Sequence, residues 1–171
     1  MYAHPSCPPR PLDLLLNHPL KLTSLSLYLN RPIYAILIIN KAGGLIYNRT
    51  FGPPHLLPLS GNDYLVLAGT FHGIHAISRQ LSPTTLPRHS SGITSLQTSR
   101  FLLTCFQTPT GVKFLLFSEP AMDVAVLEGK TRRLYECYAE FVGRNPFQTV
   151  EMPVRSEKFE RAVLGQVVAG R

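Results

Sequence analysis

The chain has 171 residues, 44% of them hydrophobic, which suits one globular domain that buries about 70% of its unfolded surface. Its net charge of +7 would favour an acidic partner, but the Lys and Arg residues are scattered, so charge alone does not indicate nucleic-acid binding. No apolar stretch reaches the roughly 20 residues of a membrane-spanning helix. Three cysteines, Cys7, Cys105 and Cys137, lack the spacing of a zinc or dithiol site, which suits a reducing compartment.

Residues 1–32 differ in composition from the rest of the chain. They carry six of the fifteen prolines and a leucine-rich patch, Leu12 to Leu16, that His18 and Pro19 interrupt. The segment lacks the charged start, the unbroken apolar centre and the cleavage site of a signal peptide. We therefore expect a flexible, Pro-rich N-terminal extension over 1–32, followed by one domain over 33–171.

The run from Ile33 to Tyr47 predicts a β-hairpin. An apolar strand, Ile33 to Ile39, precedes a turn-forming segment, Asn40 to Gly44, and a second strand follows. Side chains alternate along a strand, so two sets are expected on opposite faces: Ile33, Ala35, Leu37 and Ile39 against Tyr34, Ile36 and Ile38. Because both sets are apolar, both faces of the sheet must be covered.

The next element is a predicted helix over 62–79, with Ser60 or Asn62 as its N-cap. Helical spacing defines an inner stripe that is expected to meet the sheet: Tyr64, Leu67, Ala68, Phe71, Ile74 and Ser78. Apolar residues and glycines also lie off this stripe: Leu65, Val66, Gly69, Gly73 and Ile77. A helix that is apolar nearly all round indicates a second packing partner.

The remaining elements complete the fold. A polar strand over 92–98 suits a sheet edge, and apolar strands over 101–106 and 112–117 form a second hairpin. A helical region opens at Glu119-Pro120, with Leu127, Thr131, Leu134, Tyr138 and Phe141 on one face, and a last helix begins near Ser156, with Phe159, Ala162, Val163, Gln166 and Val167 inside. The order predicts an α+β fold of the longin-like or profilin-like group: a five-stranded antiparallel sheet with one helix on one face and two on the other.

Three stretches in this order resemble the synbindin-type subunit of the TRAPP (transport protein particle) vesicle-tethering complex: residues 39–47, residues 71–77, and Asn145-Pro146-Phe147 followed by residues 151–155. The resemblance spans Ile33 to about Val168. It implies a longin-like fold and a non-catalytic core subunit, beside a second longin-like subunit and other TRAPP subunits. Relatives with a PDZ-like insert after the second strand differ from this chain, whose Gly52 to Gly61 connection is too short for one.

The resemblance also implies the subunit's role. It would help to form the docking surface for nucleotide exchange on a Rab GTPase in ER-to-Golgi and Golgi traffic, with the exchange activity belonging to the complex. The expected location is cytoplasmic, peripheral at cis-Golgi and endoplasmic reticulum membranes through the complex. No nucleic-acid partner and no cofactor are expected.

Six residues are candidates for a protein interface: Lys41, Gly43, Gly44, His72, His75 and Arg79. The turn glycines could equally serve only to supply positive φ, and they form no phosphate loop, since the lysine precedes them. His72 and His75 have a zinc-compatible spacing but no evident third ligand, and are expected at the surface or an interface. No catalytic, cofactor-binding or metal residue is predicted.

Two points stay open at this stage. Asn145-Pro146-Phe147 fits a binding loop and fits equally a helix stop whose Phe147 packs into the core. Other functions remain as alternatives: a longin-type coat adaptor subunit, or a small basic RNA-binding protein with salt-sensitive binding. A SNARE would need a heptad repeat and a membrane anchor after the domain, which this sequence does not carry.

Overall fold

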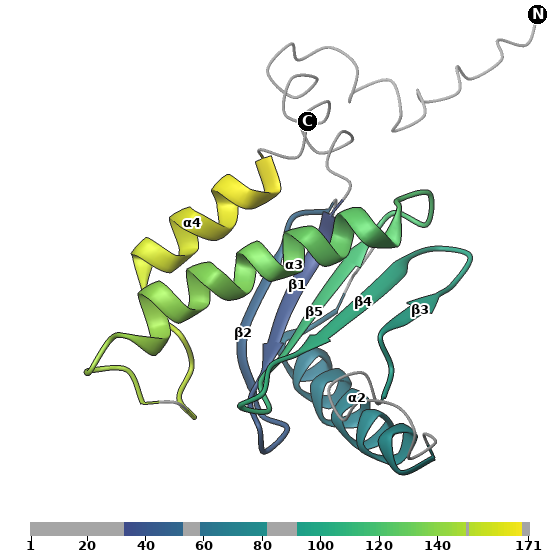
Figure 1. The fold of residues 1–171 in the computed structure, drawn as a ribbon, viewed down its shortest axis with the longest axis horizontal. Helices are drawn as coiled ribbons and strands as arrows, with labels where there is room; N and C mark the ends of the chain where they lie inside the picture. The colour runs from purple at the N-terminus through teal and green to yellow at the C-terminus, as the bar shows by residue number, and fades with distance from the viewer. Residues whose placement is uncertain (1–32, 53–58, 82–91, 150, 169–171) are drawn as a thin grey trace, which may run out of the picture. The chain divides into compact units, whose positions relative to one another are not determined.

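A five-stranded antiparallel sheet organises the computed structural model, which describes residues 33–52, 59–81, 92–149 and 151–168. The expected extension over 1–32 lies outside these residues. The strands lie side by side in the order β2-β1-β5-β4-β3, so β1 and β5 form the centre of the sheet (Figure 1). The strands are β1 (Ile33–Ile39), β2 (Leu45–Thr50), β3 (Ser95–Gln97), β4 (Leu102–Gln107) and β5 (Lys113–Ser118).

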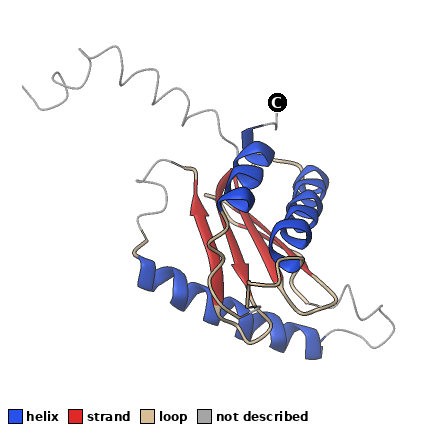
Figure 2. Cartoon of the chain, turned by 90° about the vertical axis from the view of Figure 1, so that its left-hand side faces the viewer, coloured by secondary structure: helices blue, strands red, loops and turns tan. Residues whose placement is uncertain are grey.

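Helices cover both faces of this sheet. They are α2 (Gly61–Leu81), α3 (Val124–Tyr138), its continuation as the π-helical turn η1 (Ala139–Gly143), and α4 (Glu157–Val168). Figure 2 shows one long helix, α2, on one side of the strands and the other helices on the opposite side. The predicted α+β class, with one helix against one face and two against the other, is confirmed.

The central strand β1 is buried on both faces, as its unbroken apolar run predicts. Ala35, Leu37 and Ile39 belong to the core beneath α2, whereas Ile36 and Ile38 belong to the core beneath α3 and α4. The prediction was wrong for Ile33 and Tyr34, which lie on exchanged faces. The pairing of β1 with β5 shifts register between Ile33 and Ala35, and such a bulge reverses the alternation locally.

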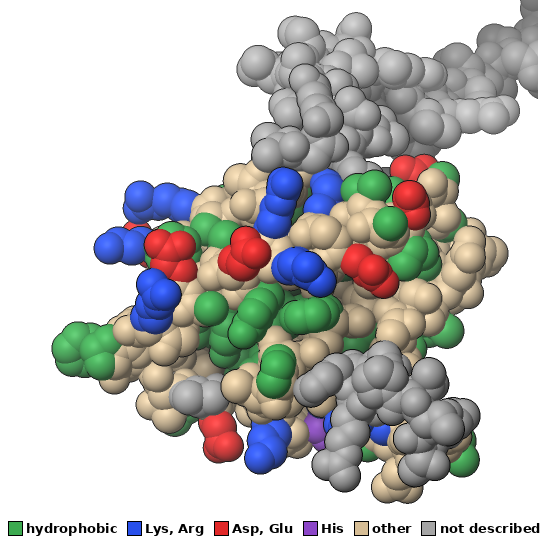
Figure 3. Space-filling model, in the orientation of Figure 1, with side chains coloured by type: hydrophobic (Ala, Val, Ile, Leu, Met, Phe, Trp, Pro, Cys, Tyr) green, Lys and Arg blue, Asp and Glu red, His purple; other side chains and the backbone are tan. Residues whose placement is uncertain are grey.

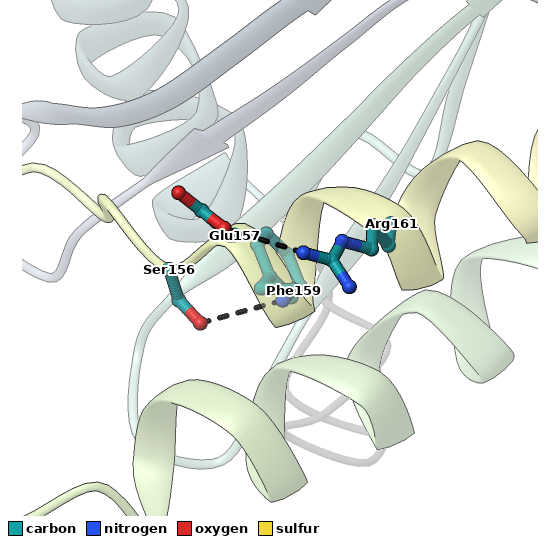
Figure 4. Close-up of polar contacts among 4 residues, drawn as sticks. All are labelled: Ser156, Glu157, Phe159 and Arg161. Carbon is teal, nitrogen blue, oxygen red and sulfur yellow. Dashed lines mark hydrogen bonds and ion pairs between the residues drawn. The ribbon is translucent and has the colours of Figure 1, made fainter.

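Each helix starts with a side chain that satisfies free backbone N–H groups. Ser60 caps α2, where Oγ accepts from Asp63 N at 3.3 Å and Asp63 Oδ2 accepts from Ser60 N at 2.8 Å. Asp123 caps α3 through a 3.0 Å bond from Ala125 N, and so this helix begins later than its predicted opening at Glu119-Pro120. In α4, Ser156 Oγ accepts from Phe159 N at 3.3 Å, as predicted (Figure 4).

The inner side of α2 differs from the predicted stripe. The buried residues are Tyr64, Ala68, Phe71 and His75, whereas Ile74 is 52% exposed. The inner faces of the later helices follow the prediction, with Leu127, Thr131, Leu134 and Tyr138 buried in α3 and Phe159, Val163 and Val167 in α4. No helix in the described segments is long and apolar enough to cross a membrane.

Candidate protein-interaction surface

The turn between β1 and β2 is held against α2. Asn40 N donates to Gly44 O at 2.8 Å, and the Asn40 side-chain Oδ1 accepts from Gly44 N at 2.7 Å. Gly43 has a φ of 95°, and a methyl group built there would lie 3.0 Å from Cγ of His72. The turn therefore needs glycine both for its backbone conformation and for its close approach to the helix.

A lysine and a histidine meet beside this turn. Nζ of Lys113, at the start of β5, lies 3.2 Å from Nδ1 of His72 and 3.3 Å from the carbonyl oxygen of Gly111. The side chain of Lys113 is only 4% exposed. Lys41 packs nearby, since a methyl group at Gly111 would be 3.1 Å from its Cγ. Two hairpin turns and one helix thus bring these side chains to one end of the sheet.

His75 lies deeper than sequence reasoning placed it. The residue is 3% exposed, its ring stacks on Phe71 at a centroid distance of 5.8 Å, and Nε2 lies 2.7 Å from Oε1 of Gln107. A methyl group at Gly92 would come within 2.6 Å of Cε1 of His75 and 2.9 Å of Cγ of Arg79. The expectation of a surface position for His75 was wrong. Its hydrogen bond to Gln107 instead connects α2 to the last residue of β4.

The electrostatics of this cluster favour neutral imidazoles. Burial lowers the pKa of His72, and the positive charge of Lys113 and His75 lowers it further. Burial also lowers the pKa of His75, against the opposing effect of its hydrogen bond to Gln107. The pKa of Lys113 is lowered by burial as well. Burial raises the pKa of the nearby Cys105 thiol to about 12, so this cysteine is an unreactive core residue.

The solvent side of α2 carries large apolar side chains. We call these residues the outer face of α2: Leu65, Val66, Ile74, Ile77 and Leu81. Their exposed fractions run from 52% for Ile74 to 79% for Leu81. A methyl group built at Gly69 or Gly73 on the same helix would meet no other atom within 4 Å, so there is open space beside both glycines. Exposed apolar clusters of this kind are common where proteins bind one another, so the outer face of α2 is a candidate contact surface.

The structure brings the six predicted residues into one neighbourhood. Gly43 lies against His72, and Gly92 places the side chains of His75 and Arg79 together. Lys113 and Gln107 complete the cluster, and sequence reasoning missed both. The available signal was polarity: Lys113 is the single charged residue of the buried strand β5, where a polar side chain needs a partner.

The structure also bears on two other sequence features. Phe147 is 94% exposed, so the interpretation of Asn145-Pro146-Phe147 as a helix stop with a buried phenylalanine was wrong. In the described segments, no three His, Cys, Asp or Glu side chains lie close enough to hold a metal ion.

The architecture defines a class of small α+β domains. The structure of the Roadblock/LC7 domain from Streptomyces avermitilis superposes with a TM-score of 0.50 at 12% sequence identity, covering 68% of this chain and 92% of that domain. At this identity the likeness concerns the fold alone. It agrees with the longin-like arrangement of one helix and two helices around a five-stranded sheet.

Sequence relatives identify the family. The model of the sybindin-like family matches residues 33–169, and the chain belongs to this family. It is 43% identical over 128 residues to trafficking protein particle complex subunit 4 of Dictyostelium discoideum, covering 75% of this chain and 90% of that protein. Subunit 4 of Bos taurus is also 43% identical, over 65% of this chain but only 47% of its own length. A more distant likeness, 30% over 57% of this chain and 64% of the relative, is to subunit 1 of the same complex in Rattus norvegicus.

Proposed function

We propose that the chain is a non-catalytic subunit of a trafficking protein particle complex and binds a neighbouring subunit through the outer face of α2. The observation that carries this proposal is the exposed apolar cluster on α2, including Ile77 at 60% exposure. Fully burying an exposed side chain of this type contributes about 1.5–3 kcal/mol, so covering several of these partly exposed ones offsets part of the cost of association. The names of the relatives supply the identity of the assembly.

The neighbouring subunit is a second longin-like protein of the subunit 1 type. This chain resembles subunit 1 as well as subunit 4, which supports two related domains in one assembly. Related domains with complementary helix faces can pair in the manner of a pseudo-symmetric dimer. The complex, rather than this chain, would carry the contact with cytoplasmic faces of cis-Golgi and endoplasmic reticulum membranes.

The contribution to nucleotide exchange is positional. A Rab GTPase releases its nucleotide faster when the surface that binds it prefers the nucleotide-free conformation, because a partner shifts an equilibrium only by its differential affinity. The paired subunits would form that surface together. The isolated chain is therefore expected to show little exchange activity, whereas the assembled complex accelerates release; strong activity of the chain alone would contradict the shared surface.

A matched pair of substitutions tests the contact. Ile77→Asp changes the outer face of α2, and Val126→Asp changes an apolar side chain of α3 that is 48% exposed. The tagged full-length chain carrying either change is purified from its own cells, and the recovered subunits are quantified. We expect Ile77→Asp to lose the other subunits and Val126→Asp to retain them. Equal recovery with both variants, or recovery of RNA or coat proteins in place of these subunits, would refute the proposal.

A further inference from the structure

The two parts of the described chain carry very different charge. Residues 33–118, which include the sheet and α2, contain six Lys and Arg residues, five of them in the described segments, and one acidic residue, Asp63. Asp63 is already engaged in the cap of α2 by Ser60. Residues 119–168 contain seven basic and eight acidic residues. Arg49 pairs with Glu160 of α4, so the excess of positive net charge near α2 in the described segments comes from residues such as Lys41 and Lys113.

The pairing of Lys113 with His72 fixes which ring nitrogen carries the proton. A lysine ammonium group can only donate, so Nδ1 of His72 accepts, and the proton of the neutral imidazole is on Nε2. The bond to Lys113 is the hydrogen bond that the structure gives the His72 ring, and no described residue accepts from Nε2. Nε2 also does not belong to the buried unpaired atoms, so it remains within reach of an approaching group.

His72 also lies next to the apolar contact surface. Leu65, His72 and Arg79 are seven residues apart, which is close to two helical turns each, so they share one flank of α2. Leu65 is 55% exposed and is the residue of the outer face of α2 that lies on this flank, whereas Ile74, nine residues or about two and a half turns later, lies on the opposite flank. A protein that covers Leu65 and follows this flank for about two turns therefore reaches the His72 ring.

We propose that His72 donates its Nε2 proton in a hydrogen bond to a carboxylate of the subunit that covers the outer face of α2, with Lys113 directly behind the ring as the source of positive charge. This inference rests on the proposed function and specifies the chemistry of the partner: an apolar surface bordered by an aspartate or glutamate. A carboxylate is favoured over a neutral acceptor because it also compensates the nearly buried Lys113 ammonium group.

The test compares three variants of the full-length chain in binding to the subunit 1-type protein of the same organism. His72→Glu places a carboxylate where the partner's carboxylate is expected, and it can pair with Lys113, so the fold is retained. His72→Gln keeps an N–H donor of similar reach without the ring. Ile77→Asp serves as the test of the apolar contact. Thermal melting checks that every variant is folded.

We expect His72→Glu to weaken binding by about 30-fold or more and His72→Gln by about tenfold or less, since like-charge contacts and lost charged hydrogen bonds have effects of this size. The affinity of the unchanged chain should also fall more steeply between 50 and 300 mM NaCl, roughly the range that screens exposed charges, than that of His72→Glu.

The outcomes separate the two proposals. If Ile77→Asp abolishes binding while folded His72→Glu binds with unchanged affinity, the carboxylate contact is refuted and the apolar contact stands. If Ile77→Asp also binds normally, the proposed function fails with it. Labelling the histidines with ¹⁵N gives an independent check in the free chain, because His72 must show the Nε2–H tautomer; an Nδ1–H signal would refute the arrangement.

Discussion

The two faces of the sheet are closed in different ways. On one face, α3 and α4 pack on the sheet and on each other, and their aromatic residues interlock, as where Phe159 lies edge-on to Tyr47 and Tyr138. On the other face, α2 is the helix of the described segments that covers the strands, and it leaves apolar side chains on its solvent side. The first face is closed by two packed helices, whereas the second leaves an apolar surface of the kind to which another protein can bind.

Charge follows the same division. Figure 3 shows Lys or Arg side chains interspersed with Asp or Glu side chains on the face that carries α3 and α4. Ion pairs form there: Arg49 bonds Glu160, and Arg161 lies 3.3 Å from Glu157 within α4 (Figure 4). Around α2, Lys113 has a histidine and a carbonyl as partners instead of a carboxylate. A surface that lacks its counter-charge is suited to specific recognition more than to stability.

The largest expected effect compares how much stability is lost when a buried aromatic ring is removed from the core on either face of the sheet. Phe159→Ala removes a fully buried ring between two tyrosines, and we expect the free energy of unfolding to fall by about 3–5 kcal/mol. Phe71→Ala, on the inner side of α2, should have a smaller effect, because a single covering helix leaves the site freer to relax. Urea denaturation of both variants measures the difference. Equal losses would show that the face under α2 is as tightly closed as the other.

A glycine pair gives the next largest effect, and the two members should differ in sign. Gly92 has a φ of 119° and no room for a methyl group beside His75, so Gly92→Ala should destabilise the domain by about 1–3 kcal/mol. Gly129 in α3 meets nothing within 4 Å, and Gly129→Ala should stabilise by about 0.5–1 kcal/mol through helix propensity. Thermal melting distinguishes them; a stabilising Gly92→Ala would show that the His75 side chain moves aside freely.

The pH dependence of stability should come from the histidines on the α2 side. The pKa values of His72 and His75 are lowered in the folded chain, so below the unfolded value near 6.5 the unfolded chain binds protons that the folded chain does not. The contribution of the two histidines to the free energy of unfolding is therefore complete above the unfolded pKa near 6.5. It declines as the pH falls below this value toward the lowered pKa of the folded chain. We expect the free energy of unfolding to decrease from pH 7.5 to 5.5, and to decrease less in His75→Gln.

Urea titrations at each pH measure this slope for both proteins. A slope that His75→Gln leaves unaltered would show that the pKa of His75 is the same in the folded and the unfolded chain, which would contradict the expected lowering.

The smallest expected effect concerns the ion pair between Arg49 and Glu160, whose side chains are both 40% exposed. Such a pair contributes about 0–1 kcal/mol and weakens with salt. Arg49→Ala should therefore lower the free energy of unfolding by less than about 1 kcal/mol, and the difference should shrink in 1 M NaCl. A double-mutant cycle with Glu160→Ala isolates the pair, and a larger, salt-independent coupling would contradict a surface role.

Sequence patterns predicted the buried side of an element well where its apolar residues recur with a single spacing along the chain. Phe159, Val163 and Val167 in α4 are spaced so that only one face can be buried, and that face is the one observed. In α2 the pattern was ambiguous because apolar residues surround the helix. Hydrophobicity favoured Ile74 over His75 for the inner side, but Gln107 supplies a hydrogen bond to the buried ring, and that partner lies 32 residues away.

Backbone irregularities and long-range polar contacts were beyond sequence reasoning. The bulge in β1 exchanges Ile33 and Tyr34 between faces although both are apolar, so no side-chain pattern marks it. The candidate residues came from the turn chemistry of Lys41 to Gly44, the spacing of His72 and His75, and the exposed faces expected for the 62–79 helix. Their common neighbourhood, and the place of Lys113 within it, depend on how two hairpins and a helix meet in space.

The strand order has a consequence for how the chain acquires its structure. The strand β1 pairs with β2 a few residues away, but its other neighbour, β5, begins more than 70 residues later. During synthesis the hairpin of β1 and β2 is therefore complete while one edge of its most apolar strand still lacks a neighbour, and non-local pairing of this kind is slow. The time between the synthesis of β1 and that of β5 is therefore when we expect this protein to be most prone to aggregation.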